Sequence, residues 1–72
     1  MLAADAMTSE KTYDEALSWC ESKGMSLATE KQLKQWGGSD GCFWALEGKA
    51  IVPSSGRNCS SDKDGKYSVR CY

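Results

Sequence analysis

The apolar residues between Thr12 and Gly24 recur at the spacing of one helix face. They occupy positions i, i+3, i+4 and i+7, as Tyr13, Ala16, Leu17 and Cys20. Thr12 and Glu15 have the spacing of a capping box, in which each side chain bonds the backbone N–H of the other residue. Gly24 is a stop signal, and Lys23 would complement the helix dipole in the last turn. The pattern predicts a helix that begins after Thr12 and ends before Gly24.

A second capping-box pattern lies between Thr29 and Gln32 and predicts a shorter helix that starts near Glu30. Its apolar face and its stop signal follow in order: Leu33 and Trp36, then Gly37 and Gly38. Between the two helices, Met25 and Leu27 alternate with polar residues. This short alternation predicts an extended link that enters the core.

From residue 41 onward the apolar residues recur with a period of two, which is typical of strands. Residues 42–47 and 49–52 are rich in apolar side chains and flank Gly48, which predicts a β-hairpin. Residues 53–61 are rich in Ser, Gly and Asn and predict a polar loop that contains Cys59. The next four residues, 62–65, predict a turn.

The end of the chain predicts one more strand and completes the expected fold. Residues 66–71 alternate, with Tyr67, Val69 and Cys71 on one face and Lys66, Ser68 and Arg70 on the other. The half-apolar stretch "MLAADAM", residues 1–7, is compatible with a first strand. The predicted fold class is α+β, with two N-terminal helices packed on a small antiparallel sheet.

The charge of the chain is nearly balanced, with nine Lys and Arg residues against ten Asp and Glu residues. This balance gives no electrostatic reason to expect nucleic acid or an anionic membrane as a partner. No apolar run approaches the roughly 18 residues of a membrane span, so we expect no direct membrane insertion. The N-terminal residues lack the basic region and the long apolar stretch of a signal peptide. We therefore expect residues 1–72 to be one domain, excised from a longer exported protein.

The four cysteines are Cys20, Cys42, Cys59 and Cys71, and the chain has no histidine. No pair of cysteines has C-x-x-C spacing, so a structural zinc site is poorly supported. An even number of cysteines in a small chain favours two disulfides and an oxidising compartment. Three pairings are possible, and the cysteine positions alone leave all three open.

Two stretches resemble the C-type lectin-like fold. The run "TYDEALSWCESKGMSLATEKQL", residues 12–33, resembles its helical front half, and "YSVRC", residues 67–71, resembles its last strand. Within the first stretch, "SLATEKQL" is similar to an "LPTe-qL" run of bacterial members, with Ala28 where Pro is usual. The family pairs its first cysteine with its last and its two inner cysteines with each other. The resemblance therefore implies two disulfides, Cys20–Cys71 and Cys42–Cys59.

The chain departs from the calcium-dependent, sugar-binding members of this family. Those members carry an E-P-N or Q-P-D triplet and a W-N-D triplet, which supply oxygen ligands to Ca²⁺. Neither triplet is present, because Pro53 lies between Val52 and Ser54 and no Trp precedes an Asn. The resemblance instead implies a compact member of the kind at the tips of intimin-like and invasin-like bacterial surface adhesins. We expect neither a metal nor a cofactor, and a location outside the cell or on the bacterial cell surface.

The resemblance also implies a function in recognition rather than catalysis. We expect a non-catalytic adhesion module that binds a host or neighbouring-cell surface protein, or a glycan, without calcium. The expected contact region consists of two loops, residues 37–41 and 53–64, held by the inner disulfide. Its candidate ligand-binding residues are Asp40, Arg57, Asn58, Asp62 and Lys63. Two alternatives stay open: a structural cap of a surface adhesin, and a freestanding secreted disulfide-rich effector or inhibitor.

Catalytic and calcium-binding interpretations have little support in the residues. There is no histidine, the cysteines are expected to be bridged, and no Ser lies in a nucleophile motif. Asp40 and Glu47 flank the strand that begins at Cys42, and two carboxylates in such a place are expected to be solvated surface groups. The run Asp62-x-Asp64-Gly65 matches part of a calcium loop, but it lacks the further ligands and predicts a solvated turn.

Three tryptophans are many for a chain of this length. Trp36 and Trp44 fall on faces that are expected to be core. Trp19 lies off the apolar stripe of the first helix, on the side of Glu15 and Ser22. It is expected either to pack against the N-terminal strand or an upstream domain, or to act as an exposed binding anchor.

Overall fold

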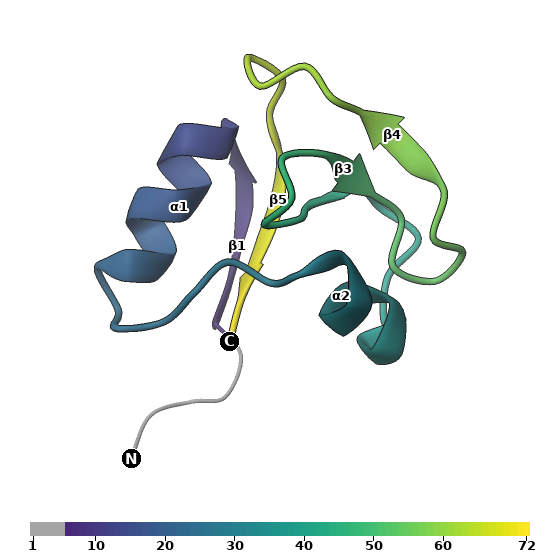
Figure 1. Ribbon diagram of the computed structural model, residues 1–72, viewed down its shortest axis with the longest axis horizontal. Coiled ribbons are helices and arrows are strands. Elements are labelled where there is room, and N and C mark those ends of the chain that lie inside the picture. Colours follow the sequence, from purple (N-terminus) through teal and green to yellow (C-terminus); the bar gives the residue numbers. More distant parts are fainter. Residues whose placement is uncertain (1–5) are drawn as a thin grey trace.

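The computed structural model describes residues 6–72, which form two helices and a five-stranded sheet (Figure 1). The elements follow in the order β1 Ala6–Lys11, α1 Tyr13–Glu21, α2 Glu30–Trp36, β2 Phe43–Trp44, β3 Ala50–Ile51, β4 Asn58–Ser60 and β5 Tyr67–Cys71. Most of the strand expected in residues 1–7 lies outside the described residues, and the observed first strand begins at Ala6. The α+β class is confirmed.

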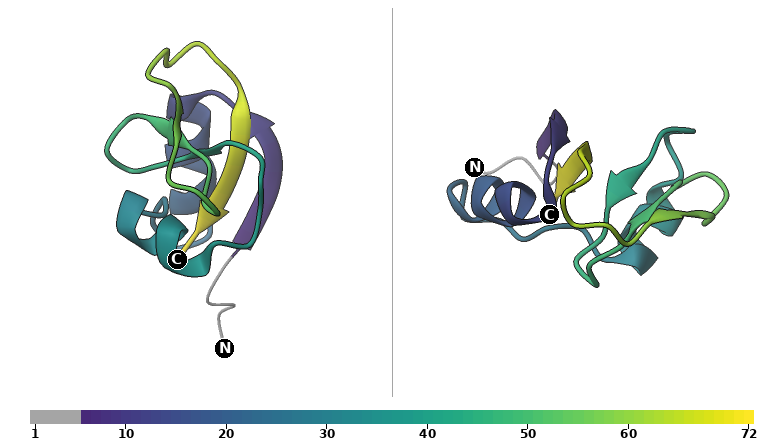
Figure 2. Two further views of the ribbon diagram at one scale, coloured as in Figure 1. Left: turned by 90° about the vertical axis from the view of Figure 1, so that its right-hand side faces the viewer. Right: turned by 90° about the horizontal axis from the view of Figure 1, so that it is seen from above.

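The sheet is mixed, so the prediction of an antiparallel sheet is wrong in one respect. The strand order is β1-β5-β2-β3-β4. The last strand, β5, is antiparallel to β1, where Ala6 pairs with Cys71, but parallel to β2, where Phe43 pairs with Ser68. Figure 2 shows β1 and β5 side by side in both of its views. The alternation of a strand predicts which faces it presents, but not which strand will lie next to it or in which direction.

The hairpin is confirmed, and the loop after it contains a strand that the sequence did not predict. Phe43 pairs with Ile51 and Trp44 with Ala50, and Gly48 in the turn has a φ of 92°. Within the predicted loop 53–61, residues Asn58–Ser60 form β4 and pair with β3. These polar residues carry no strand pattern of their own, and the Cys42–Cys59 bridge holds them beside the hairpin.

Both predicted capping boxes are present. Glu15 Oε1 accepts from the Thr12 N–H at 3.0 Å, and at α2 Gln32 Oε1 accepts from the Thr29 N–H at 2.9 Å. The predicted role of Lys23 is wrong, because α1 ends at Glu21 and has no basic residue in its last turn. Its ammonium instead lies 4.7 Å from the centre of the Trp19 ring.

The core has two clusters, one under each helix. The first joins α1 to β5 and the hairpin and contains Ala16, Cys20, Leu27, Trp44, Ala50, Val69 and Cys71. The second lies under α2 and contains Ala28, Leu33, Phe43, Ala45 and Ile51. The disulfide pairing implied by the family resemblance is confirmed as Cys20–Cys71 and Cys42–Cys59. The outer bridge is fully buried in the first cluster and ties α1 to β5.

The alternation in residues 66–71 correctly predicts that Val69 and Cys71 are buried, but one residue of its polar face, Arg70, is not open to water. Arg70 is only 5% exposed. Its guanidinium lies 4.0 Å from the centre of the Trp36 ring, and its Nε donates to the Tyr72 hydroxyl at 3.1 Å. The Arg70 guanidinium therefore connects α2 to the face of β5 that is opposite the first core cluster.

The two glycines after α2 have different physical roles. Gly37 takes the left-handed conformation that closes the helix, with a φ of 58°. Gly38 instead leaves room for the Trp36 indole, because a Cβ at Gly38 would lie 2.5 Å from the indole Cε2. The indole has little freedom to move, since the Phe43 ring and the Arg70 guanidinium also contact it.

We expect the substitution Gly38→Ala to lower the free energy of unfolding by about 1–3 kcal/mol, because the new methyl group forces a packed indole to shift. Gly41→Ala is the matched control, since a Cβ there meets only the Ser39 Oγ at 3.5 Å. The control is expected to stay within about 0.5 kcal/mol of the parent protein. Urea unfolding of the three proteins measures both values, and equal stability of the two variants would contradict the explanation.

Candidate functional site

The structure joins the first predicted contact loop to the first part of the second. Ser54 connects them, because its Oγ donates to Asp40 Oδ1 at 2.8 Å and its N–H donates to the Ser39 carbonyl at 3.2 Å. We refer to residues 37–41 and 53–58 together as the loop rim. The rim adjoins β4, at the opposite edge of the sheet from β1.

Two of the predicted site residues, Arg57 and Asn58, stand on the rim with exposed side chains. The backbone beneath them is held in place, since the Arg57 carbonyl accepts from the Val52 N–H at 2.9 Å and its N–H donates to Ser55 Oγ at 3.3 Å. Within residues 6–72 neither side chain has a hydrogen-bond or ion-pair partner. The rim therefore presents one guanidinium and one amide on a fixed backbone.

The other two predicted residues, Asp62 and Lys63, lie in a separate loop. This loop precedes β5 and is at the top of Figure 1, near the start of α1. Asp62 Oδ1 accepts from the Asp64 N–H at 3.0 Å, as in an ordinary turn, and the Lys63 ammonium lies 5.0 Å from the centre of the Tyr13 ring. The predicted set is thus divided, with Asp40, Arg57 and Asn58 on the rim and the other two residues apart from it. No group of three or more potential metal ligands is present among residues 6–72.

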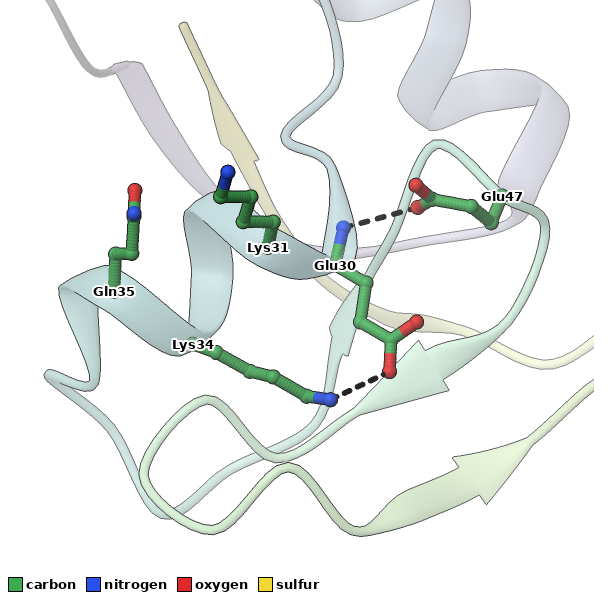
Figure 3. Close-up of a pocket in the computed structure, with 5 residues that line it drawn as sticks. All are labelled: Glu30, Lys31, Lys34, Gln35 and Glu47. Atoms are coloured by element: carbon green, nitrogen blue, oxygen red, sulfur yellow. Dashed lines mark hydrogen bonds and ion pairs between the residues drawn. The ribbon is translucent and has the colours of Figure 1, made fainter.

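A groove of about 570 Å³ follows the outer face of α2. Figure 3 shows the side chains that line it, which are Glu30, Lys31, Lys34, Gln35 and Glu47. Both carboxylates are already engaged. Glu30 forms ion pairs of 2.9 Å with Lys34 and with Lys49, and Glu47 Oε1 accepts from the Glu30 N–H at 2.9 Å. The Lys34 ammonium, followed by that of Lys49, lowers the pKa of the Glu30 carboxyl by stabilising its charged form.

Lys34 connects this groove to the loop rim. A Cβ at Gly56 would lie 2.9 Å from Lys34 Cε, so the lysine stem crosses directly over the rim backbone. The sequence interpretation did not assign any residue of α2 to the contact region. The available signal was the Glu30 and Lys34 pair at i, i+4, but that spacing is also common on helix surfaces that bind nothing.

A second groove, of about 420 Å³, lies beside α1 and is lined by Lys11, Asp14, Glu15, Ser18 and Trp19. Trp19 is partly buried against the first core cluster, and Lys11 at the end of β1 shares the groove with it. The Thr12 N–H, through its hydrogen bond to Glu15, is the main cause that lowers the pKa of this carboxyl. Glu15 is therefore already used in the capping box.

Comparison with known proteins assigns no family: no protein-family model and no curated protein matches the chain. Among residues 6–72, neither helix is long and apolar enough to cross a membrane. The two disulfides are typical of an extracellular or other oxidising environment.

Proposed function

We propose that this chain is a compact C-type lectin-like domain that acts as a non-catalytic recognition module outside the cell or on a bacterial cell surface. Its ligand is a surface protein or a glycan of a host or neighbouring cell, bound without calcium. The helix and strand motifs quoted above and the two nested disulfides support this family assignment. The antiparallel pairing of the first and last strands, β1 and β5, is consistent with it.

The observation that carries the binding proposal is that the loop rim presents, on a fixed backbone, exposed side chains without partners among residues 6–72. Arg57 and Asn58 are exposed and have no partner within the described chain, while the backbone under them is tied to its neighbours. A fixed loop loses little conformational entropy on binding, and arginine is a frequent centre of binding energy in protein interfaces. The α2 groove, which Lys34 joins to the rim, extends the available surface.

A binding screen against immobilised host surface proteins and glycans tests this function. Against any ligand found, we expect the double variant Arg57→Ala/Asn58→Ala to weaken binding by about 2 kcal/mol, or about 30-fold. Lys63→Ala is the matched control, because it removes an exposed cation away from the rim. Calcium and a chelator are expected to give the same affinity, since both calcium-binding triplets are missing.

Two outcomes would contradict the proposal. A ligand whose affinity is unchanged in the double variant would place the contact elsewhere. The absence of any ligand among proteins and glycans would favour the structural-cap alternative.

A further inference from the structure

The groove beside α1 contains hydrogen-bonding groups that the fold does not use. Asp14 and Ser18 are one helical turn apart and both line the groove. Within residues 6–72 neither side chain has a hydrogen-bond or ion-pair partner. This distinguishes them from Glu30 and Glu47 of the α2 groove, whose carboxylates are both engaged.

Trp19 is the one aromatic residue among those that line the same groove. It packs in part against the first core cluster, and the Lys23 ammonium lies over the ring at 4.7 Å without lining the groove. The Trp19 side chain is thus held by its neighbours while it stays partly exposed. A large aromatic surface held in this way offers apolar contact at a small cost in side-chain entropy.

The charges in this groove are close to balanced. Lys11 lies there with Asp14 and Glu15, and Lys66 is close enough to Glu15 to stabilise its charged form. A strongly charged ligand would therefore gain little from the groove.

A ligand that fits these features is uncharged, carries several hydroxyls and has one apolar face. We propose that the groove beside α1 binds one ring of a neutral saccharide, with its C–H face against the Trp19 indole. The sugar hydroxyls donate hydrogen bonds to the Asp14 carboxylate and the Ser18 hydroxyl. This site goes beyond the proposed function, because it lies on the β1 side of the molecule and uses no residue of the loop rim.

The three indole N–H groups allow a direct test on ¹⁵N-labelled protein, with the methyl glycosides of glucose, galactose, mannose and N-acetylglucosamine as probes. We expect at least one probe to shift the Trp19 indole signal in a saturable way, while the fully buried Trp44 signal stays unchanged. The substitution Asp14→Asn is expected to weaken binding about tenfold. Ser18→Ala is expected to weaken it less, because it removes a bond to an uncharged hydroxyl. Both residues are exposed, so both variants should keep the fold. Gln35→Ala, in the other groove, is the control and should leave the affinity unchanged.

Three results would overturn the saccharide site. One is that no neutral glycoside shifts the Trp19 signal, and another is that the Asp14→Asn/Ser18→Ala double variant binds as well as the parent. The third is a saccharide whose binding is lost on Arg57→Ala/Asn58→Ala but not on Asp14→Asn. That third result would leave the proposed function unaffected. Binding at Trp19, together with a loop rim that binds nothing, would instead support the saccharide site and contradict the proposed role of the rim in binding.

Discussion

Replacing Cys20 and Cys71 together with alanine is expected to lower the free energy of unfolding by about 4 kcal/mol or more. The bridge joins residues that are 51 positions apart, and loop-closure entropy for a loop of this length corresponds to about 4 kcal/mol. Both half-cystines are fully buried between α1 and β5, so lost packing adds to the effect. A domain of this size has a total stability of only about 4–10 kcal/mol, and we expect the variant to be largely unfolded at 37 °C.

The inner bridge provides the matched comparison. Cys42 and Cys59 are 17 positions apart and only partly buried, so their replacement with alanine should cost about 3 kcal/mol. Urea unfolding under non-reducing conditions, followed by circular dichroism, measures both variants. If removal of the inner bridge destabilised the protein more than removal of the outer one, the outer bridge between α1 and β5 would not be the more important covalent link in the fold.

The second large effect is expected at Trp44, which is fully buried in the first core cluster. The rings of Tyr13 and Tyr67 contact it edge to face, with centroids 5.3 Å and 5.2 Å away. Its indole N–H donates to the Lys11 carbonyl at 2.8 Å and so ties the hairpin to the end of β1. Trp44→Ala removes the ring and the hydrogen bond together and is expected to cost about 3–5 kcal/mol.

Trp44→Phe separates the two contributions. It keeps an aromatic ring in the core but leaves the Lys11 carbonyl without its donor, so we expect a smaller loss of about 1–3 kcal/mol. Trp19→Phe is the control, because Trp19 is only partly buried and its indole N–H has no partner within residues 6–72. Denaturant unfolding gives all three values. A loss below about 1 kcal/mol for Trp44→Ala would contradict the central role of this ring.

The parts of the fold that were predicted correctly depend on interactions between residues close in sequence. The capping boxes at Thr12 and Thr29 each join residues three positions apart, and the Gly48 hairpin pairs neighbouring segments. Such contacts form in whatever tertiary structure surrounds them, so their signals can be read from the chain alone. The disulfide pairing was different, since the cysteine positions left it open and only the resemblance to the C-type lectin-like fold implied it.

The candidate site was predicted only in part, because only its local features can be read from the sequence. Polar loops near the inner disulfide were visible in the sequence, and Asp40, Arg57 and Asn58 do lie on one rim. The sequence could not predict that Lys63 lies apart from that rim, because its position depends on where the loop before β5 passes the start of α1. The groove along α2 could not be predicted either, since it forms only when the hairpin residue Glu47 is brought to the first turn of α2.

By itself the sequence determined the two helices and their N-terminal caps, the hairpin, and the apolar face of the last strand, because each follows from local spacing and side-chain chemistry. Only the tertiary structure decided that β5 lies between β1 and β2, which makes the sheet mixed. It also decided that Arg70, on the polar face of that strand, is buried against Trp36. Both outcomes depend on residues more than 20 positions apart in the chain, and no local pattern records which distant partner a strand or a charged side chain will meet.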